Sequence, residues 1–256
     1  MLTQPSDAGA AAQVPPVQVP PAQVPPPGHV LDHPVWASLA GHHAHFAERH
    51  GRAVRYHPDV APFVALADPA DPRAWADAAA LVGPGGTLAL AGPATWPEDE
   101  WEVEFQGGSV QLVDTALQAR PHPEAVRLGP EDVPEILELV ARTQPGPFRP
   151  RTVELGTYLG IRRDGVLVAM AGERQHPPGW TEISAVCTDE AYRGQGLATG
   201  LVRAVAAGIR ARGETPFLHA NAANTGAIRL YESLGFTLRR RSLFTALRSV
   251  ATPPAV

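Results

Sequence analysis

The spacing of apolar residues in the first half of the chain predicts both strands and helices. Alternating or continuous apolar runs predict strands at 53–57, 63–67 and 86–92. A helix is predicted over 71–83, because proline stands at a first helical position and glycine follows the last apolar residue. Val35, Leu39 and Phe46 keep an approximately helical period that ends at Gly51, which predicts a second helix.

The stretch from 101 to 114 predicts a β-hairpin. Its two arms, WEVEF at 101–105 and VQLVD at 110–114, alternate in polarity, and the intervening QGGS is typical of a turn. This half of the chain is therefore predicted to be α/β, and it contains no motif that indicates a chemistry.

The second half of the chain predicts a regular succession of strands and helices. Asp164-Gly165 between two apolar runs is a strong hairpin signal. The strands are expected at 124–129, 181–188, 216–221 and 237–247, and the helices at 130–143, 197–213 and 224–235.

The two ends of the chain differ from the rest in composition. The unit QVPPx occurs three times between Gln13 and Pro27 without aromatic or charged residues, which predicts an extended tail over 1–28. The boundaries we expect are an N-terminal domain at 29–119, a second domain at 125–248 and a short tail at 249–256.

Composition narrows the class of protein. The chain has 256 residues and a net charge of −5, and all of its basic residues are arginine. An acidic balance disfavours nucleic-acid and anionic-membrane partners, and no apolar run is long enough to span a bilayer. One cysteine and no recognisable signal peptide lead us to expect a cytoplasmic protein.

A glycine-rich stretch carries the clearest chemical signal. YRGQGLATG at 192–200 places Gly194 and Gly196 immediately before a predicted helix. Glycines allow a tight turn, and a helix N-terminus offers free N–H groups and a positive dipole end. The stretch therefore predicts an anion site.

Two signatures together identify a family resemblance. Arg193-x-x-Gly196-x-Ala198 matches the acyl-CoA motif of the GNAT superfamily of N-acyltransferases, and the stretch from Asn224 to Phe236 matches its second signature. The resemblance covers about residues 125–247 and implies a mixed central β-sheet flanked by helices. The first half is either a degenerate second copy of this fold or a distinct small α/β cap.

The resemblance implies acetyl-CoA as acyl donor. Backbone N–H groups at the glycine-rich turn would hold its pyrophosphate, and its pantetheine arm would lie in a slot between splayed strands. The residues assigned to the donor in this way are Val186, Cys187, Thr188, Arg193, Gly194, Gln195, Gly196, Leu197, Ala198, Thr199 and Asn224. Asn224 is also a candidate N-cap of the helix predicted at 224–235.

The resemblance also implies direct transfer, which needs an acid and a base. Tyr231 stands at the family position of the acid that protonates the departing thiolate. His219 and Glu182 are alternative bases, with Glu173 third. We interpret Cys187 as a buried apolar side chain rather than as a nucleophile.

The predicted function is transfer of an acetyl group from acetyl-CoA to a primary amine of a small molecule, amino acid or peptide. The alternative is a non-catalytic acyl-CoA-binding regulatory module. No metal is expected, because the histidines at 42, 43 and 45 lack a nearby carboxylate. Monomer and homodimer both stay open.

Overall fold

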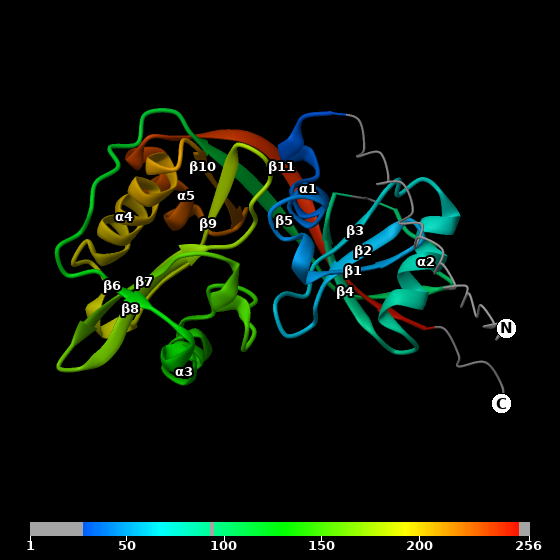
Figure 1. Cartoon of the computed structure of the whole chain (residues 1–256), viewed down its shortest axis with the longest axis horizontal. Coiled ribbons are helices and arrows are strands. Elements are labelled where there is room, and N and C mark those ends of the chain that lie inside the picture. The colour runs from blue at the N-terminus through cyan, green and yellow to red at the C-terminus, as the bar shows by residue number, and fades with distance from the viewer. Residues whose placement is uncertain (1–27, 93–94, 251–256) are drawn as a thin grey trace, which may run out of the picture.

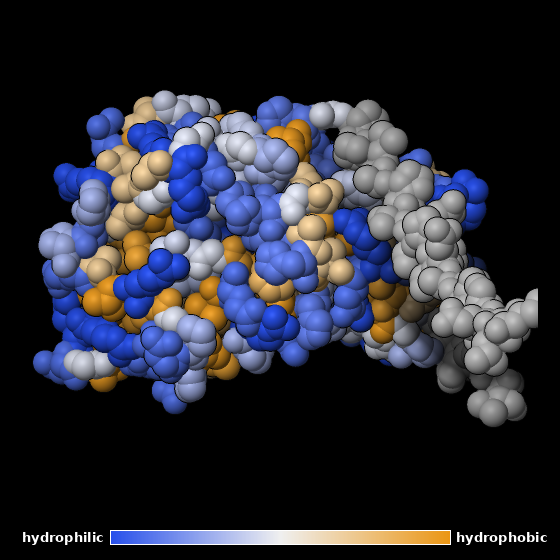
Figure 2. Space-filling view, in the orientation of Figure 1, coloured by the Kyte–Doolittle hydropathy of each residue, from blue (hydrophilic) through white to orange (hydrophobic). Residues whose placement is uncertain are grey.

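The computed structural model describes residues 28–92 and 95–250 (Figure 1). The repeats between Gln13 and Pro27 and the end of the predicted tail at 249–256 lie outside the described residues. In the described part of the chain, no helix is both long and apolar enough to cross a membrane. Figure 2 shows hydrophilic residues over most of one face of the molecule.

A mixed eight-stranded sheet runs through the molecule and confirms the predicted fold class. Only β9 and β10 pair in parallel, and the other neighbours are antiparallel. In spatial order the strands are β4 (Thr87–Ala91), β11 (Phe236–Ser249), β5 (Trp101–Asp114), β10 (Thr215–Asn221), β9 (Trp180–Thr188), β8 (Val166–Glu173), β7 (Tyr158–Arg163) and β6 (Val126–Leu128).

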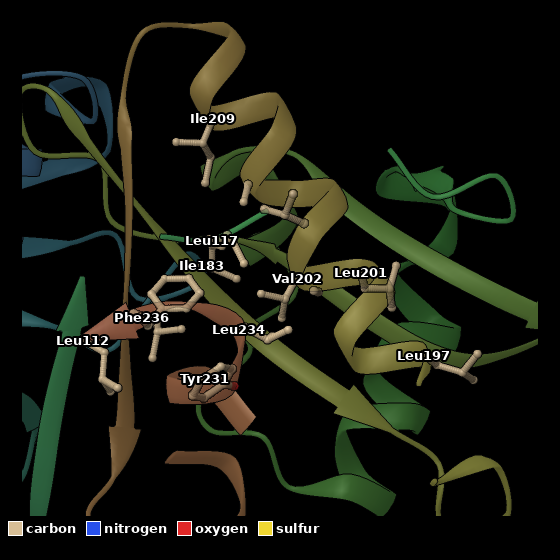
Figure 3. Packing of buried hydrophobic residues seen from close by; sticks show 14 of the residues in the cluster. Leu112, Leu117, Ile183, Leu197, Leu201, Val202, Ile209, Tyr231, Leu234 and Phe236 are labelled. Carbon is tan, nitrogen blue, oxygen red and sulfur yellow. The ribbon is translucent and has the colours of Figure 1, made fainter. Parts of the chain in front are cut away.

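Helices α4 (Leu197–Ala211) and α5 (Thr225–Leu234) cover one face of this sheet (Figure 3). The parallel pairing of β9 and β10 requires a crossover connection, which α4 supplies. Leu201 and Val202 of α4 pack with Leu112 of β5 and Leu234 of α5 in one buried apolar cluster.

Helix α3 (Val133–Thr143) covers the β6–β9 half of the opposite face. The rest of that face is covered by residues 28–82, which we call the N-terminal region. The region contains α1 (Pro34–Ala40), β1 (Ala47–His50), β2 (Ala53–Tyr56), β3 (Val64–Leu66) and α2 (Pro72–Val82). Its three strands form a separate antiparallel sheet.

The helix predicted to continue to Gly51 is wrong. Helix α1 ends at Ala40, residues 44–46 form a single 3-10 turn, and β1 follows directly. The turn is held by long-range contacts, because buried His43 bonds the Tyr56 hydroxyl at 2.9 Å and the Leu155 carbonyl at 3.1 Å. These tertiary contacts outweigh the helical period.

The predicted hairpin at 101–114 is also wrong. Strand β5 is continuous, and Gly107 and Gly108 pair with Phe244 and Leu243 of β11. Neither glycine has a positive φ. Strand β11 has the same length as β5 and supplies a partner along almost all of it, so the Gly-Gly pair continues the sheet.

Strands β4 and β5 belong to the eight-stranded sheet although they precede residue 119. The division at 119–125 and the origin of the first half as a second GNAT copy stay predictions. Within the described residues 28–92, the only strand-to-strand pairings of the N-terminal sheet are antiparallel.

Candidate active site

Strands β9 and β10 diverge partway along their length. Their parallel register runs from Trp180 opposite Thr215 to Ile183 opposite Leu218 and ends there, although both strands continue. A β-bulge lies at the same place, because Ala185 has φ of 53° and the pairing with β8 shifts around it. A bulge bends its strand, so it opens a gap between β9 and β10.

A cavity of about 1020 Å³ occupies this gap and continues under the N-terminal region. Its lining includes the ends of β9 and β10, the start of α4, one side of α5 and parts of α1 and β3. The volume lies at the upper end of the range for small-molecule pockets, about 300–1000 Å³. It is therefore large enough for two small substrates together.

The glycine-rich turn leaves the start of α4 open to a ligand. Gly194 and Gly196 both have φ of +78°, a conformation that other residues adopt only with strain. Asp71 caps α2 and Asn224 caps α5, as the sequence predicts for Asn224, but no side chain in the described part of the chain caps α4. The first N–H groups of α4 are thus free of a side-chain cap, as the predicted anion site requires.

Six of the residues predicted to bind the donor line the cavity: Val186, Cys187, Thr188, Arg193, Ala198 and Asn224. The remaining five, Gly194, Gln195, Gly196, Leu197 and Thr199, form the turn and first helical residues beside it. A Cβ atom at Gly194 or Gly196 would meet no atom within 4 Å, so the need for glycine here is conformational.

Tyr231 lies on the α4–α5 face of the sheet and lines the cavity. It is 8% exposed and packs edge-on against Phe236. Burial raises the pKa of Tyr231 to about 12, so its hydroxyl stays protonated at neutral pH. The group can donate a proton into the cavity.

His219 lies on the opposite face of the same sheet. Leu218 pairs with Leu112 beneath α4, whereas His219 pairs with Gln111, and side chains of successive strand residues alternate between faces. Both His219 and Tyr231 nevertheless line the cavity. The gap between β9 and β10 therefore connects the two faces of the sheet.

Glu182 is fully buried and ion-paired. Arg174 binds both of its carboxylate oxygens at 2.7 and 2.9 Å, and His219 Nδ1 lies 2.8 Å from Oε1. Burial alone would raise the pKa of Glu182, but the charge of Arg174 and the hydrogen bonds from Arg174 and His219 outweigh it and lower the pKa to about 2. Glu182 is thus a permanent anion that orients its partners.

Gln111 fixes the other nitrogen of His219. Its side-chain amide donates to the Leu31 carbonyl at 2.8 Å and lies 3.1 Å from His219 Nε2, while Arg239 donates to its oxygen at 2.7 Å. These partners fix the orientation of the amide. In this arrangement His219 donates from Nδ1 to Glu182 and accepts from the Gln111 amide at Nε2.

Sequence reasoning missed Arg174 and Gln111. Gln111 stands between Val110 and Leu112, a pattern that indicates only that it faces away from the apolar side of the strand. The sequence also treats Glu182 and His219 as alternatives, whereas the structure joins them in one hydrogen-bonded pair.

The remaining candidates lie apart from the cavity or are unreactive. Glu173 pairs with Arg212 at 3.0 Å and is absent from the described lining. Cys187 is buried, which raises the pKa of its thiol. Among the residues that the structure describes, no three His, Cys, Asp or Glu side chains are grouped as metal ligands.

The curated proteins that this chain matches are acetyltransferases. The FR47-like protein family matches residues 158–245. Residues of this chain are 36% identical over 143 positions to the mycothiol acetyltransferase of Thermobispora bispora and 37% identical over 90 positions to the N-alpha-acetyltransferase RimI of Mycobacterium tuberculosis. These matches cover 52% and 33% of this chain, respectively. The chain spans between 23% and 56% of the length of the curated relatives that it matches.

One solved structure matches over much more of the chain. A putative acetyltransferase of the GNAT family from Novosphingobium aromaticivorans is 40% identical, with a TM-score of 0.80. The match covers 88% of this chain and 100% of that one, so it includes much of the N-terminal region as well as the splayed sheet. Together with the diverging strands and the open helix N-terminus, this match shows that the chain belongs to the GNAT family of acetyltransferases.

Proposed function

We propose that the protein transfers an acetyl group from acetyl-CoA directly to a primary amine. The observation that carries this proposal is a single cavity that passes through the sheet. It has the open start of α4 and Tyr231 on one face and His219 on the other. Donor and acceptor can thus approach each other from opposite faces.

On the donor side, backbone groups suit the pyrophosphate and the pantetheine arm. The N–H groups from Gly194 to Thr199 would bind the pyrophosphate. Asp189 N–H donates to the Val168 carbonyl across β8, so alternation directs the N–H of Thr188 away from β8, toward the gap. The buried Thr188 hydroxyl has no partner among the described residues, which fits a group completed by a ligand.

The bond changes follow from this arrangement. The amine nitrogen attacks the thioester carbonyl, a C–N bond forms, and the C–S bond breaks. His219 Nε2 takes the proton from the amine, and the Tyr231 hydroxyl protonates the departing thiolate. Glu182 and Arg174 act as positioning residues, because Glu182 keeps the Nδ1 proton of His219 in place.

A second candidate function is acyl-CoA binding without transfer. The observation that favours it is the contact between Gln111 and His219 Nε2, because a base must have this lone pair free for the amine. In the proposed reaction the acceptor amine displaces the Gln111 amide. In the binding module this contact persists and no amine is acetylated.

Calorimetric titration with acetyl-CoA, followed by assay of thiol release with a panel of amines, separates these functions. Binding with amine-dependent thiol release is expected for the transferase. Binding without release across small amines, amino acids and peptides would favour the module. Heat absent from wild type would contradict both.

A matched pair of variants tests the donor site. Gly196 and Gly213 lie at the two ends of α4, both have φ of +78°, and a Cβ at either meets nothing within 4 Å. Gly196→Arg is expected to abolish acetyl-CoA binding, because its side chain extends beside the open N-terminus. Gly213→Arg, with the same backbone strain, is expected to bind normally.

A further inference from the structure

The acceptor side of the cavity continues well beyond His219. From the gap it passes over the outer half of β5 and ends between β4, β11 and the N-terminal region. We call this part, lined by α1, β3 and the outer halves of β4, β5 and β11, the apolar chamber. Its described lining over these elements from Val35 onward carries no charged side chain, and the Arg174 guanidinium lies 4.9 Å from the centre of the Phe63 ring.

The floor of the apolar chamber is bare because of Gly107. Gly107 faces the chamber between Phe105 and Ser109, and it pairs with Phe244 of β11. A Cβ at Gly107 would come within 2.9 Å of the Phe105 ring. The Gly-Gly pair that predicted a turn from the sequence thus leaves space for a ligand above the sheet.

Three aromatic rings line this chamber in a row. The Phe244 ring centre lies 6.3 Å from that of Phe63 and 6.3 Å from that of Phe105. Phe105 is 49% exposed although it belongs to the central sheet. An exposed aromatic ring beside two others suits a flat apolar group of a ligand.

Two buried polar atoms of the cavity lining lack partners. Trp36 Nε1 and Gln175 Oε1 have none among the described residues, although the two residues are 1% and 4% exposed. Buried donors and acceptors in native proteins nearly always have a partner. A ligand with an amide group would supply both a carbonyl for Trp36 and an N–H for Gln175.

The distance between the two ends of the acceptor side sets the minimum length of an acceptor that reaches both. His219 pairs with Gln111 and Phe244 pairs with Gly107, so these positions lie four residues apart along β5. At about 3.3 Å per residue, they are separated by about 13 Å along the strand. An acceptor that reaches both must have a long body.

We propose that the acceptor is a primary amine on a long apolar body that ends in an aromatic ring and includes an amide. The amine lies at the gap beside His219, and the ring lies against Phe63, Phe244 and Phe105. This rests on the proposed function for the transfer step itself. It disfavours a polyol such as an amino sugar, because the rings of Phe63, Phe105 and Phe244 offer its hydroxyl groups no hydrogen bonds.

Acetyl transfer to four amines tests the proposal. N-(4-aminobutyl)benzamide carries amine, amide and ring; 6-phenylhexylamine lacks the amide, benzylamine is short, and 6-aminohexanol lacks the ring. We expect KM to be lowest for the benzamide, followed by phenylhexylamine. Phe105→Ala should raise the KM for these two about 2- to 10-fold and leave the KM for acetyl-CoA and for 6-aminohexanol unchanged.

Val103→Ala is the matched control, since Val103 is 43% exposed on the same strand but pairs with Leu247 beyond a β-bulge, so it faces away from Phe105, and it is absent from the described cavity lining. Equal KM values for all four amines would overturn the proposal while leaving the transferase intact. So would faster transfer from octanoyl-CoA to benzylamine, since the chamber would then hold the acyl chain.

If no amine is acetylated, the proposed function fails. A binding measurement then tests separately whether the apolar chamber holds an aromatic amine. The benzamide is then titrated into protein saturated with CoA. Binding that Phe105→Ala weakens and Val103→Ala does not supports an aromatic-amine site. No binding overturns it.

Discussion

The proposed donor and acceptor sides of the cavity are built in different ways. The donor side is made largely of backbone groups from one short stretch, with Gly194 and Gly196 setting the turn before α4. The proposed acceptor side is lined by side chains from segments far apart in the sequence, such as Trp36, His219 and Phe244. A backbone site leaves a local sequence signature, and a side-chain site leaves almost none.

Removal of the Tyr231 hydroxyl should have the largest effect, and it acts on the donor side. Tyr231→Phe is expected to lower kcat about 100-fold or more with little change in acetyl-CoA binding, because the thiolate loses its proton donor. Tyr158→Phe is the control: Tyr158 is also buried, its hydroxyl has no partner among the described residues, and it is absent from the described cavity lining. Equal turnover by the two variants would remove Tyr231 from the mechanism.

The buried carboxylate of the acceptor side should dominate the acid stability. The pKa of Glu182 is lowered to about 2 in the folded protein, from an ordinary value of 4.5. Its contribution is therefore complete above pH 4.5 and is lost as the pH falls toward 2. The difference corresponds to about 3 kcal/mol of unfolding free energy.

Denaturant unfolding of wild type and Glu182→Gln between pH 7 and pH 3 measures this contribution. At pH 7 the variant is expected to be less stable by about 3–5 kcal/mol, because Arg174 is left buried without its partner. The two proteins should approach each other in stability as the pH falls. A constant difference across this range would contradict the assignment.

Replacing glycine by alanine at the two ends of α4 should lower the stability by an intermediate amount. Alanine at a left-handed position costs about 1–2 kcal/mol. Gly196→Ala and Gly213→Ala should therefore lower the melting temperature by similar amounts. Only Gly196→Ala should weaken acetyl-CoA binding in calorimetry. If both variants bind acetyl-CoA with the same affinity, the turn at Gly196 is not part of the donor site.

The smallest effect concerns one hydrogen bond on the acceptor side. Trp36→Phe should remove the preference for N-(4-aminobutyl)benzamide over 6-phenylhexylamine, about 3- to 10-fold in KM. Trp101→Phe should keep it, since the buried indole N–H of Trp101 also lacks a partner among the residues that the structure describes, but Trp101 is absent from the cavity lining. A preference that survives in both variants would exclude Trp36 from acceptor recognition.

The contrast between the two sides also explains what the sequence could predict. The mixed fold and the cap at Asn224 follow from local patterns and from the family signatures, and the structure confirms them. The hairpin at 101–114 was predicted wrongly because its turn signal, Gly107-Gly108, is local, whereas its partner Phe244 lies more than a hundred residues away. Arg174 and Gln111 escape notice for the same reason, because their roles arise only through partners brought together by folding.

The pairing of β4 has a consequence for how the chain folds. Its partner in the eight-stranded sheet is β11, and Thr87 pairs with Arg248, about 160 residues later. Closing so long a loop is entropically costly, and folding slows as contacts become less local. During synthesis β4 is a strand without its neighbour until β11 has emerged, so assembly of the sheet around the cavity is a late event, and an exposed strand edge in the waiting intermediate favours aggregation.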